Sequence, residues 1–212
     1  MPEEKKRSRL GVMGGTFNPI HYGHLVTAEE ALYQFNLDKV IFMPAGVPPH
    51  KINKEILPSE ERYLLTVIAT ASNPDFVVSR LEIERKGPSY TIDTLLELHR
   101  IYGPEVGLFF ITGADAVWEI LTWKSAEKLV ELTEFIAATR PGYSLEKFKK
   151  LHVLPEDKER VKGKPRVSIM EIPALAISST DIRERVRGNR PIRYLVPEGV
   201  ASYIQKSGFW KG

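Results

Sequence analysis

Apolar runs alternate along the chain with stretches in which apolar residues recur every three or four positions. The runs predict β-strands and lie at residues 10–13, 39–43, 76–79, 108–111, 135–138 and 167–172. The stretches between them predict amphipathic helices, the first carrying Leu25, Ala28, Leu32 and Phe35. Strands that alternate with helices indicate an α/β fold with a mainly parallel sheet and right-handed crossovers.

The remaining helices are marked by their apolar residues and by capping residues. We expect a helix capped by Ser59 with Leu64, Leu65, Ile68 and Ala71 on its apolar face, and an extended segment at 81–84. Further helices are expected at 91–102, from Trp118 to Trp123, around 129–132, at 144–151, from 178 to 187 and from 197 to 207.

The run at 108–111 is apolar at every position, which predicts a central strand covered on both faces. Glycine turns follow both this run, at Gly113, and the first run, at Gly14 and Gly15. Ligands of parallel sheets lie beyond the carboxyl ends of the strands, where the winding direction reverses. The two turns are therefore predicted to meet at one cleft, together with Asp115, His21 and His24.

The stretch from Gly14 to His24 is the first candidate for chemistry. A glycine turn between a strand and a helix presents backbone N–H groups and the positive helix end, which suit a phosphate. His21 and His24 stand at the same helix end, and Gly23 leaves room for close approach to the backbone. Neither the Walker pattern nor the G-x-G-x-x-G dinucleotide pattern is present.

Three plainer readings of this stretch stay open. The glycines can form only a tight turn. The histidines can be structural, or they can be half of a zinc site. Zinc needs at least one more ligand, and the chain has no cysteine and only the isolated His50, His99 and His152 elsewhere.

Composition narrows the class of protein. A chain of 212 residues, 42% of them hydrophobic, is long enough for one substantial core, and we expect a single domain over 1–212. Within it, residues 1–8 are expected to form a frayed tail and residues 189–212 a C-terminal helical segment packed on the domain.

The net charge and the length of the apolar runs indicate which partners and which location to expect. The net charge is +3, and the basic clusters at 5–9 and 158–166 lack interleaved aromatic residues, so nucleic-acid binding is not predicted. Apolar runs stay far below the roughly 20 residues of a membrane helix. With no cysteine and no secretory signal visible, a cytoplasmic location is expected. Homo-oligomerisation is left open.

Two motifs, taken together, resemble those of the nucleotidylyltransferase superfamily. Residues 14–24 match G-[GT]-[TS]-F-[DN]-P-x-H-x-G-H, and residues 177–183 match I-S-x-T-x-x-R. The segments between them, in order, are similar to those of the bacterial nicotinate-nucleotide adenylyltransferase family over nearly the whole chain. These segments are Pro48–Lys51, Gly87–Thr91, Gly113–Asp115, Thr122–Trp123 and Arg140–Tyr143.

The resemblance implies a Rossmann-like, doubly wound sheet of the nucleotidylyltransferase type and a defined reaction. Members of that family transfer the adenylyl group of ATP to nicotinate mononucleotide, giving nicotinate adenine dinucleotide and pyrophosphate, a step of NAD biosynthesis. Mg²⁺ is the implied cofactor and accompanies the ATP phosphates rather than occupying a protein cage. In-line attack on the α-phosphorus needs no protein nucleophile, so positioning and charge stabilisation are expected to suffice.

The resemblance also implies residue roles. His21, His24 and Arg183 are the implied catalytic residues, and we expect histidines near their ordinary pKa of about 6.5 to gain a proton beside the triphosphate. The implied ATP-binding residues are Gly14, Gly15, Thr16, Phe17, His21, His24, Gly113, Asp115, Ile177, Ser178, Ser179 and Arg183. The implied acceptor-binding residues are Asn18, His50, Lys51, Tyr90, Thr91, Trp123 and Lys124.

Alternatives accompany several of these roles. Arg183 can be an ordinary exposed helix arginine, and Trp123 can be a core residue, although Trp118 is the better core candidate. Asn18 stands where many members carry Asp, and Lys124 stands where an aromatic residue is common.

Other functions of the same cleft also stay open. The cleft can serve nicotinamide mononucleotide or phosphopantetheine instead of nicotinate mononucleotide. A nucleotide-binding sensor that has lost catalysis is a further alternative. A class I aminoacyl-tRNA synthetase shares the H-x-G-H motif, but the chain shows no room for a tRNA-reading domain.

Overall fold

The computed structural model describes residues 7–47, 55–116, 126–139, 142, 144, 166–173 and 175–211. Every apolar run that predicted a strand forms one, with ends within two residues of those expected. The strands are β1 (Arg9–Gly15), β2 (Lys39–Pro44), β3 (Phe76–Val78), β4 (Gly107–Gly113), β5 (Glu134–Thr139) and β6 (Val167–Glu171).

These strands form one sheet in the order β3-β2-β1-β4-β5-β6, and all neighbouring pairs are parallel. The chain winds outward from β1 to β3, returns to place β4 on the other side of β1, and then winds outward in the opposite direction. This order is that of a Rossmann-like, doubly wound sheet, and its direction reverses between β1 and β4. The predicted fold class is therefore confirmed, and the switch point lies where the two glycine turns follow their strands.

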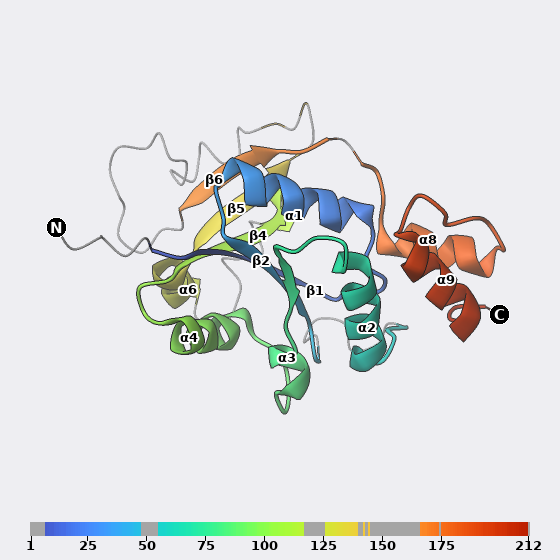
Figure 1. Ribbon diagram of the computed structural model, residues 1–212, viewed down its shortest axis with the longest axis horizontal. Coiled ribbons are helices and arrows are strands. Elements are labelled where there is room, and N and C mark those ends of the chain that lie inside the picture. Colours follow the sequence, from blue (N-terminus) through green and yellow to red (C-terminus); the bar gives the residue numbers. More distant parts are fainter. Residues whose placement is uncertain are drawn as a thin grey trace.

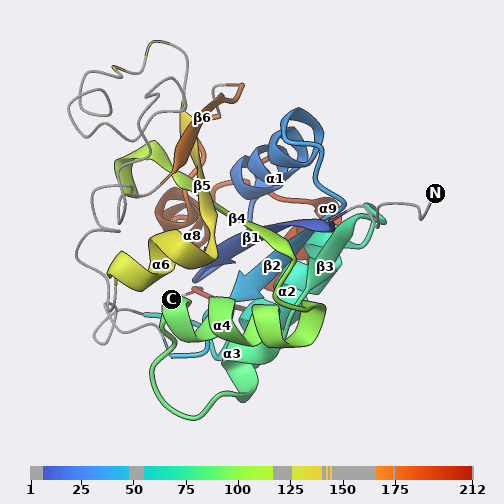
Figure 2. The same cartoon turned by 90° about the vertical axis from the view of Figure 1, so that its left-hand side faces the viewer.

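Helices cover both faces of the sheet. They are α1 (Tyr22–Gln34), α2 (Ser59–Thr70), α3 (Leu81–Glu84), α4 (Thr91–Tyr102), the 3₁₀ turn η1 (Ala114–Ala116), α6 (Ala126–Leu132), α8 (Ser179–Arg187) and α9 (Glu198–Ser207). Figure 1 shows α1 on one side of the sheet and α3, α4 and α6 on the other, and Figure 2 shows the same layers from the side.

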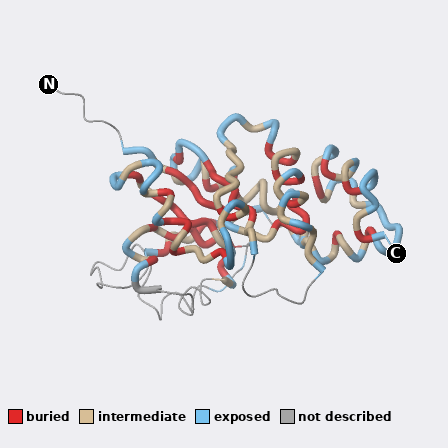
Figure 3. Tube along the Cα trace, turned by 90° about the horizontal axis from the view of Figure 1, so that it is seen from below, coloured by how far each residue is buried: buried red, intermediate tan, exposed pale blue. Residues whose placement is uncertain are grey.

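Two apolar clusters hold these layers together. In β4, Leu108 and Phe110 pack with α4 and α6 on one face, whereas Phe109 and Ile111 pack with α1 and α2 on the other. The alternation follows from the two-residue period of a strand, and it confirms that residues 108–111 form a central strand covered on both faces. Buried residues accordingly gather along β1, β2, β4 and β5, and Figure 3 shows the buried stretches toward the middle of the molecule.

The C-terminal helix extends the second cluster. Val200 and Ile204 of α9 are buried in it, and Tyr203 donates a hydrogen bond from its hydroxyl to the Glu61 carboxylate of α2 at 3.0 Å. Ile182 and Val186 of α8 join the same cluster. Within the described ranges, none of the helices combines the length and apolarity that a membrane crossing needs.

Two local predictions are wrong. Residues 81–84 form the helix α3 rather than an extended segment, because the Ser79 hydroxyl accepts a bond from the Leu81 N–H at 3.2 Å and Glu84 N–H bonds Arg80 C=O at 3.0 Å. Ser59 is the first residue of α2, and Pro58 holds the N-cap position.

The buried face of α2 also differs from the predicted one. It consists of Arg62, Leu65, Thr66, Ala69 and Thr70, whereas Leu64 is 38% exposed and Ala71 is exposed. The hydroxyls of Thr66 and Thr70 donate to backbone carbonyls one turn earlier, at 2.7 and 2.9 Å, which allows them to be buried. The predicted helices at 118–123 and most of 144–151 lie outside the described residues.

Candidate active site

A cavity of about 510 Å³ opens at the carboxyl end of the sheet, at the switch point between β1 and β4. Its volume is within the range of small-molecule sites. Its walls come from the ends of β1, β4 and β5, from the first turns of α1 and from the segment before α8. The lining residues are Met13, Gly14, His21, Gly23, His24, Thr27, Ile111, Thr112, Gly113, Ala114, Asp115, Ala138, Thr139, Ile172, Leu175 and Ile177.

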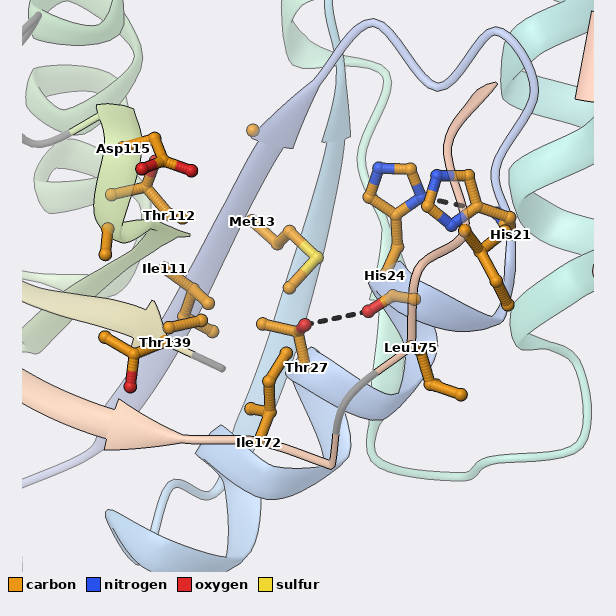
Figure 4. Close-up of a pocket in the computed structure, with 16 residues that line it drawn as sticks. Met13, His21, His24, Thr27, Ile111, Thr112, Asp115, Thr139, Ile172 and Leu175 are labelled. Carbon is orange, nitrogen blue, oxygen red and sulfur yellow. Dashed lines mark hydrogen bonds between the residues drawn. The ribbon is translucent and has the colours of Figure 1, made fainter. Parts of the chain in front are cut away.

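The two glycine turns therefore meet at one cavity, as the sequence predicted. Figure 4 shows the imidazoles of His21 and His24 on one side and Asp115 with Thr112 on the opposite side. Among the described residues, no atom lies within 4 Å of the position that a Cβ on Gly113 would occupy. The α1 helix presents its N-terminal end to the same space and has no acidic residue in its first turn. This end favours an anion.

The two histidines stack on each other. Their ring centroids lie 3.8 Å apart with 30° between the ring planes. The backbone N–H of His21 donates to Nδ1 of His24 at 3.3 Å. Because a backbone N–H can only donate, Nδ1 of His24 carries no proton in this arrangement, and the proton of the neutral ring is on Nε2. His24 is thus prepared to donate a hydrogen bond from Nε2.

His21 has a different environment. It holds the N-cap position of α1, is 7% exposed, and its buried Nδ1 has no hydrogen-bond partner in the part of the chain that the structure describes. Burial lowers the pKa of His21 to about 4. The expectation of an ordinary histidine pKa is therefore wrong for His21, because the protein interior disfavours the charged ring.

Two glycines of the motif make room for rings. A Cβ on Gly23 would lie 3.0 Å from the His21 ring, and a Cβ on Gly15 would lie 2.8 Å from the ring of Phe17. Phe17 is buried with φ at 47°, and its ring meets that of His24 edge-on at 5.1 Å between centroids. The glycines thus allow Phe17 and His21 to pack tightly beneath the site.

The helix α8 brings the second motif to the same loop, 160 positions away in the chain. The Ser179 hydroxyl donates to the Pro19 carbonyl at 2.8 Å, and Nη1 of Arg183 donates to the Asn18 carbonyl at 2.8 Å. The Ser178 hydroxyl caps α8 by accepting the Asp181 N–H at 3.1 Å. Arg183 and Ser179 are thus bonded to the loop that leads into the two histidines. Ile177 lines the cavity, whereas Ser178, Ser179 and Arg183 are not among its lining residues.

The Asn18 side chain forms its hydrogen bonds within the protein and is buried. Its Nδ2 donates to the Glu55 carbonyl at 3.0 Å, its Oδ1 accepts the Leu57 N–H at 3.1 Å, and the residue is 5% exposed. The amide therefore joins the motif loop to residues 55–57. An acidic side chain here would lose the Nδ2 donor.

Several predicted residues do not line the cavity or lie outside the description. Gly15, Thr16 and Phe17 continue the motif loop beyond the lining residue Gly14. Tyr90 and Thr91 begin α4 and are absent from the cavity wall. His50, Lys51, Trp118, Trp123 and Lys124 lie outside the described residues.

The alternative that His21 and His24 form half of a zinc site gains no further ligand from the described part of the chain. No group of three or more His, Cys, Asp or Glu side chains there is placed to hold a metal ion. His99 bonds the Leu132 carbonyl through Nε2 at 2.9 Å, between α4 and α6.

Thr112, Thr139 and Arg62 are among the residues near the site that the sequence did not predict. Thr112 and Thr139 line the cavity at the ends of β4 and β5, a position that follows from the rule for parallel sheets. Arg62 is buried and donates to the carbonyl of Thr16 at 2.9 Å. Its spacing of three residues from Leu65 was the signal that it lies on the inner face of α2.

Comparisons with known proteins agree with this geometry. The family model described as cytidylyltransferase-like matches residues 12–185. A probable nicotinate-nucleotide adenylyltransferase of Moorella thermoacetica is 56% identical over 204 residues, which is 96% of this chain and 92% of that protein. One from Thermoanaerobacter sp. is 53% identical over 98% of this chain and 96% of its own length.

The fold also matches that of solved proteins. The structure of Plasmodium falciparum nicotinic acid mononucleotide adenylyltransferase complexed with NaAD has a TM-score of 0.77 and 19% identity, covering 96% of this chain and 98% of that one. At this identity the likeness concerns the fold. Together with the closer sequence relatives, these matches mean that the chain belongs to the cytidylyltransferase-like family and, within it, to the nicotinate-nucleotide adenylyltransferases.

Proposed function

We propose that the chain transfers the adenylyl group of ATP to nicotinate mononucleotide, giving nicotinate adenine dinucleotide and pyrophosphate. The observation that carries the proposal is the meeting of both motifs at one loop beside the switch-point cavity, with stacked His21 and His24 on its wall and Arg183 bonded to Asn18. The relatives at 53% and 56% identity carry the name of this activity.

The reaction is a single displacement. A phosphate oxygen of the mononucleotide attacks the α-phosphorus of ATP, the bond from that phosphorus to the bridging oxygen breaks, and pyrophosphate leaves with the electron pair. No covalent bond to the protein forms, so the side chains act by positioning and by stabilising charge.

The triphosphate is assigned to the histidine wall and α8. His24 donates from Nε2 to the α-phosphoryl oxygen, where charge builds up in the transition state. Neutral His21 supports the ring of His24 and the N-terminal end of α1. Arg183 exchanges its bond with the Asn18 carbonyl for the β- and γ-phosphates, which its planar fork suits. The N–H groups at Ser178 and Ser179 assist, and the adenosine lies along Gly14–Phe17 and Gly113, with Asp115 on a ribose hydroxyl.

The acceptor is assigned to residues named by the family motifs. Trp123 stacks on the pyridine ring, and the backbone near Thr91 and Lys124 receives its carboxylate. Lys51 neutralises the mononucleotide phosphate, with His50 beside it. Tyr90 borders the same half-site, and Asn18 contributes by holding residues 55–57 in place rather than by touching the acceptor.

Mg²⁺ belongs to this proposal as part of the substrate complex. Asp115 is the carboxylate of the cavity wall, and the described residues contain no cluster of ligands for a resident ion. A cation that enters with the ATP phosphates needs few protein ligands. When bound, it neutralises phosphate charge.

An acceptor panel tests the proposal. Pyrophosphate release is measured with ATP, Mg²⁺ and, in turn, nicotinate mononucleotide, nicotinamide mononucleotide and phosphopantetheine. Nicotinate mononucleotide is expected to give a kcat/KM at least about tenfold above that of nicotinamide mononucleotide, or roughly 1.4 kcal/mol. A preference for phosphopantetheine would assign the chain to another acceptor, and no release with any acceptor would favour the sensor.

Two substitutions of His24 belong in the same assay. The amide nitrogen of glutamine can reach the position of Nε2, whereas that of asparagine lies near Nδ1. His24→Asn is expected to lower kcat about 100-fold or more, and His24→Gln to keep at least about ten times the kcat of His24→Asn. Equal loss in both variants, or an effect confined to KM, would contradict a donor role for Nε2.

A further inference from the structure

Arg62 of α2 is a charged side chain enclosed by the protein. It is 1% exposed, although arginine is rarely buried without an ion-pair partner. No ion pair of Arg62 is found among the described residues. Its guanidinium is satisfied by backbone carbonyls instead.

Those carbonyls come from three separate segments. Nη1 donates to Thr16 in the motif loop at 2.9 Å, and Nε donates to Leu57 at 3.0 Å, just before α2. Nη2 donates to Ala45 at 2.6 Å and to Gly46 at 3.1 Å, directly after β2. Four N–H groups of one planar fork therefore fix the motif loop, the end of β2 and the entry to α2 in a single arrangement.

The bond to Thr16 has a directional consequence. In a trans peptide the C=O and N–H point in opposite directions, so holding the Thr16 carbonyl toward Arg62 also fixes the direction of the Phe17 N–H. A cationic donor on the carbonyl also polarises the peptide and strengthens its N–H as a donor. Phe17 stays in the left-handed region at φ 47°, which costs about 1 kcal/mol or more for a non-glycine residue.

Charge around Arg62 is balanced at a distance. Burial lowers the pKa of Arg62 to about 10, and the nearby charge of Glu82 opposes this shift. The guanidinium remains protonated at neutral pH. Glu82 is itself buried, which raises the pKa of its carboxyl group, and it accepts the Thr94 hydroxyl at 2.8 Å, so α4 helps to hold the carboxylate in place.

We propose that Arg62 is a positioning residue for adenylyl transfer, which sets the direction of the Thr16–Phe17 peptide against the phosphates and ties it to residues 45–46 and 57. This inference rests on the proposed function for the identity of the ligand. Arg62 acts through the backbone and touches no substrate.

Arg62→Lys and Arg9→Lys form a matched pair for the test. Arg9 also donates to a backbone carbonyl, that of Phe35, through Nε and Nη2 at 3.2 and 3.0 Å, but it stands at the opposite end of β1. Lysine keeps the charge in both variants and cannot reach several carbonyls in a fixed fork. Thermal unfolding first defines a temperature at which each variant is fully folded.

At that temperature, kcat for pyrophosphate release and the calorimetric Kd of α,β-methylene-ATP are measured. Arg62→Lys is expected to lower kcat at least about tenfold and to weaken analogue binding at least about threefold, whereas Arg9→Lys changes both by less than about twofold. A fully folded Arg62→Lys within twofold of the parent in both readouts would overturn the proposal. So would a chain that fails to fold even in a stabilising osmolyte, because the residue would then serve stability alone.

The two readouts separate this inference from the proposed function. If the parent chain released no pyrophosphate with nicotinate mononucleotide, the proposed function would fail. The Kd of the ATP analogue would still test the positioning role of Arg62. Weaker binding in Arg62→Lys alone would support that role, and equal binding in both variants would contradict it.

Discussion

His21 shows how a single buried side chain couples the site to the stability of the fold. The residue occupies the N-cap position of α1, its imidazole stacks on His24, and its Nδ1 is enclosed with no hydrogen-bond partner among the described residues. Protonating this ring would place a charge against low-dielectric surroundings. The neutral ring therefore both keeps the stack with His24 and contributes to stability.

This environment predicts a pH dependence of unfolding. Folding lowers the pKa of His21 from 6.5 to about 4. The contribution of the neutral ring to the free energy of unfolding is therefore complete above pH 6.5 and is lost as the pH falls toward 4. The loss amounts to about 3 kcal/mol for a shift of this size. Urea unfolding of the parent and of His21→Gln, from pH 7 to pH 4, measures it as the difference between the two curves. Parallel curves would show that His21 is not buried in its neutral form.

The turn that follows β2 illustrates a constraint between elements, because it packs against α3. A Cβ on Gly46 would lie 2.1 Å from the Glu82 carbonyl oxygen, so the chain after β2 passes directly against the backbone of α3. Ser89 N–H bonds the Val47 carbonyl at 3.1 Å and continues this contact. The close approach holds the segment whose carbonyls Arg62 binds.

Substitution at this turn is expected to be costly. Gly46→Ala should lower the free energy of unfolding by about 1–3 kcal/mol, because two backbones must separate. Gly113→Ala is the control, since no atom of the described residues lies within 4 Å of its added Cβ, and its effect should stay within about 0.5 kcal/mol. Chemical denaturation of both variants checks the comparison. Equal free energies of unfolding for the two variants would show that α3 moves away from residue 46 at no cost in stability.

The positions of the strands were the most predictable feature of the fold. The period of apolar residues locates β1 to β6, and the switch-point rule places His21, His24, Gly113 and Asp115 around one cavity before any coordinate is known. Short segments were less predictable. Residues 81–84 alternate like a strand, but the Ser79 hydroxyl accepts the Leu81 N–H and so favours a helical turn, a local bond that the alternation does not reveal. The bond from the Thr94 hydroxyl of α4 to the Glu82 carboxylate is nonlocal.

Buried polar side chains were the least predictable part of the site. The spacing of Arg62 from Leu65 indicates the inner face of α2, but the carbonyls of Thr16 and Ala45 that satisfy its charge are distant in sequence and cannot be read from that spacing. The role of Asn18 likewise depends on residues 55–57, and the lowered pKa of His21 depends on burial. In each case the determining contacts are nonlocal, whereas a sequence pattern reports local periodicity.

On the scale of the whole molecule, the fold joins two distant parts of the chain. The loop after β1 and the helix α8 are linked through Ser179 and Arg183, and both rest on the apolar cluster shared by α1, α2, α8 and α9. The doubly wound sheet supplies a rigid base for this junction. We therefore expect one triphosphate to be bound by both parts at once.

A crystal structure of the chain with α,β-methylene-ATP and Mg²⁺ tests this claim most directly. We expect Nε2 of His24 and the guanidinium of Arg183 each to lie within about 3.5 Å of phosphate oxygens of the same nucleotide, with Arg183 released from the Asn18 carbonyl. A nucleotide bound elsewhere, or one that contacts His24 while Arg183 remains on Asn18, would contradict the account.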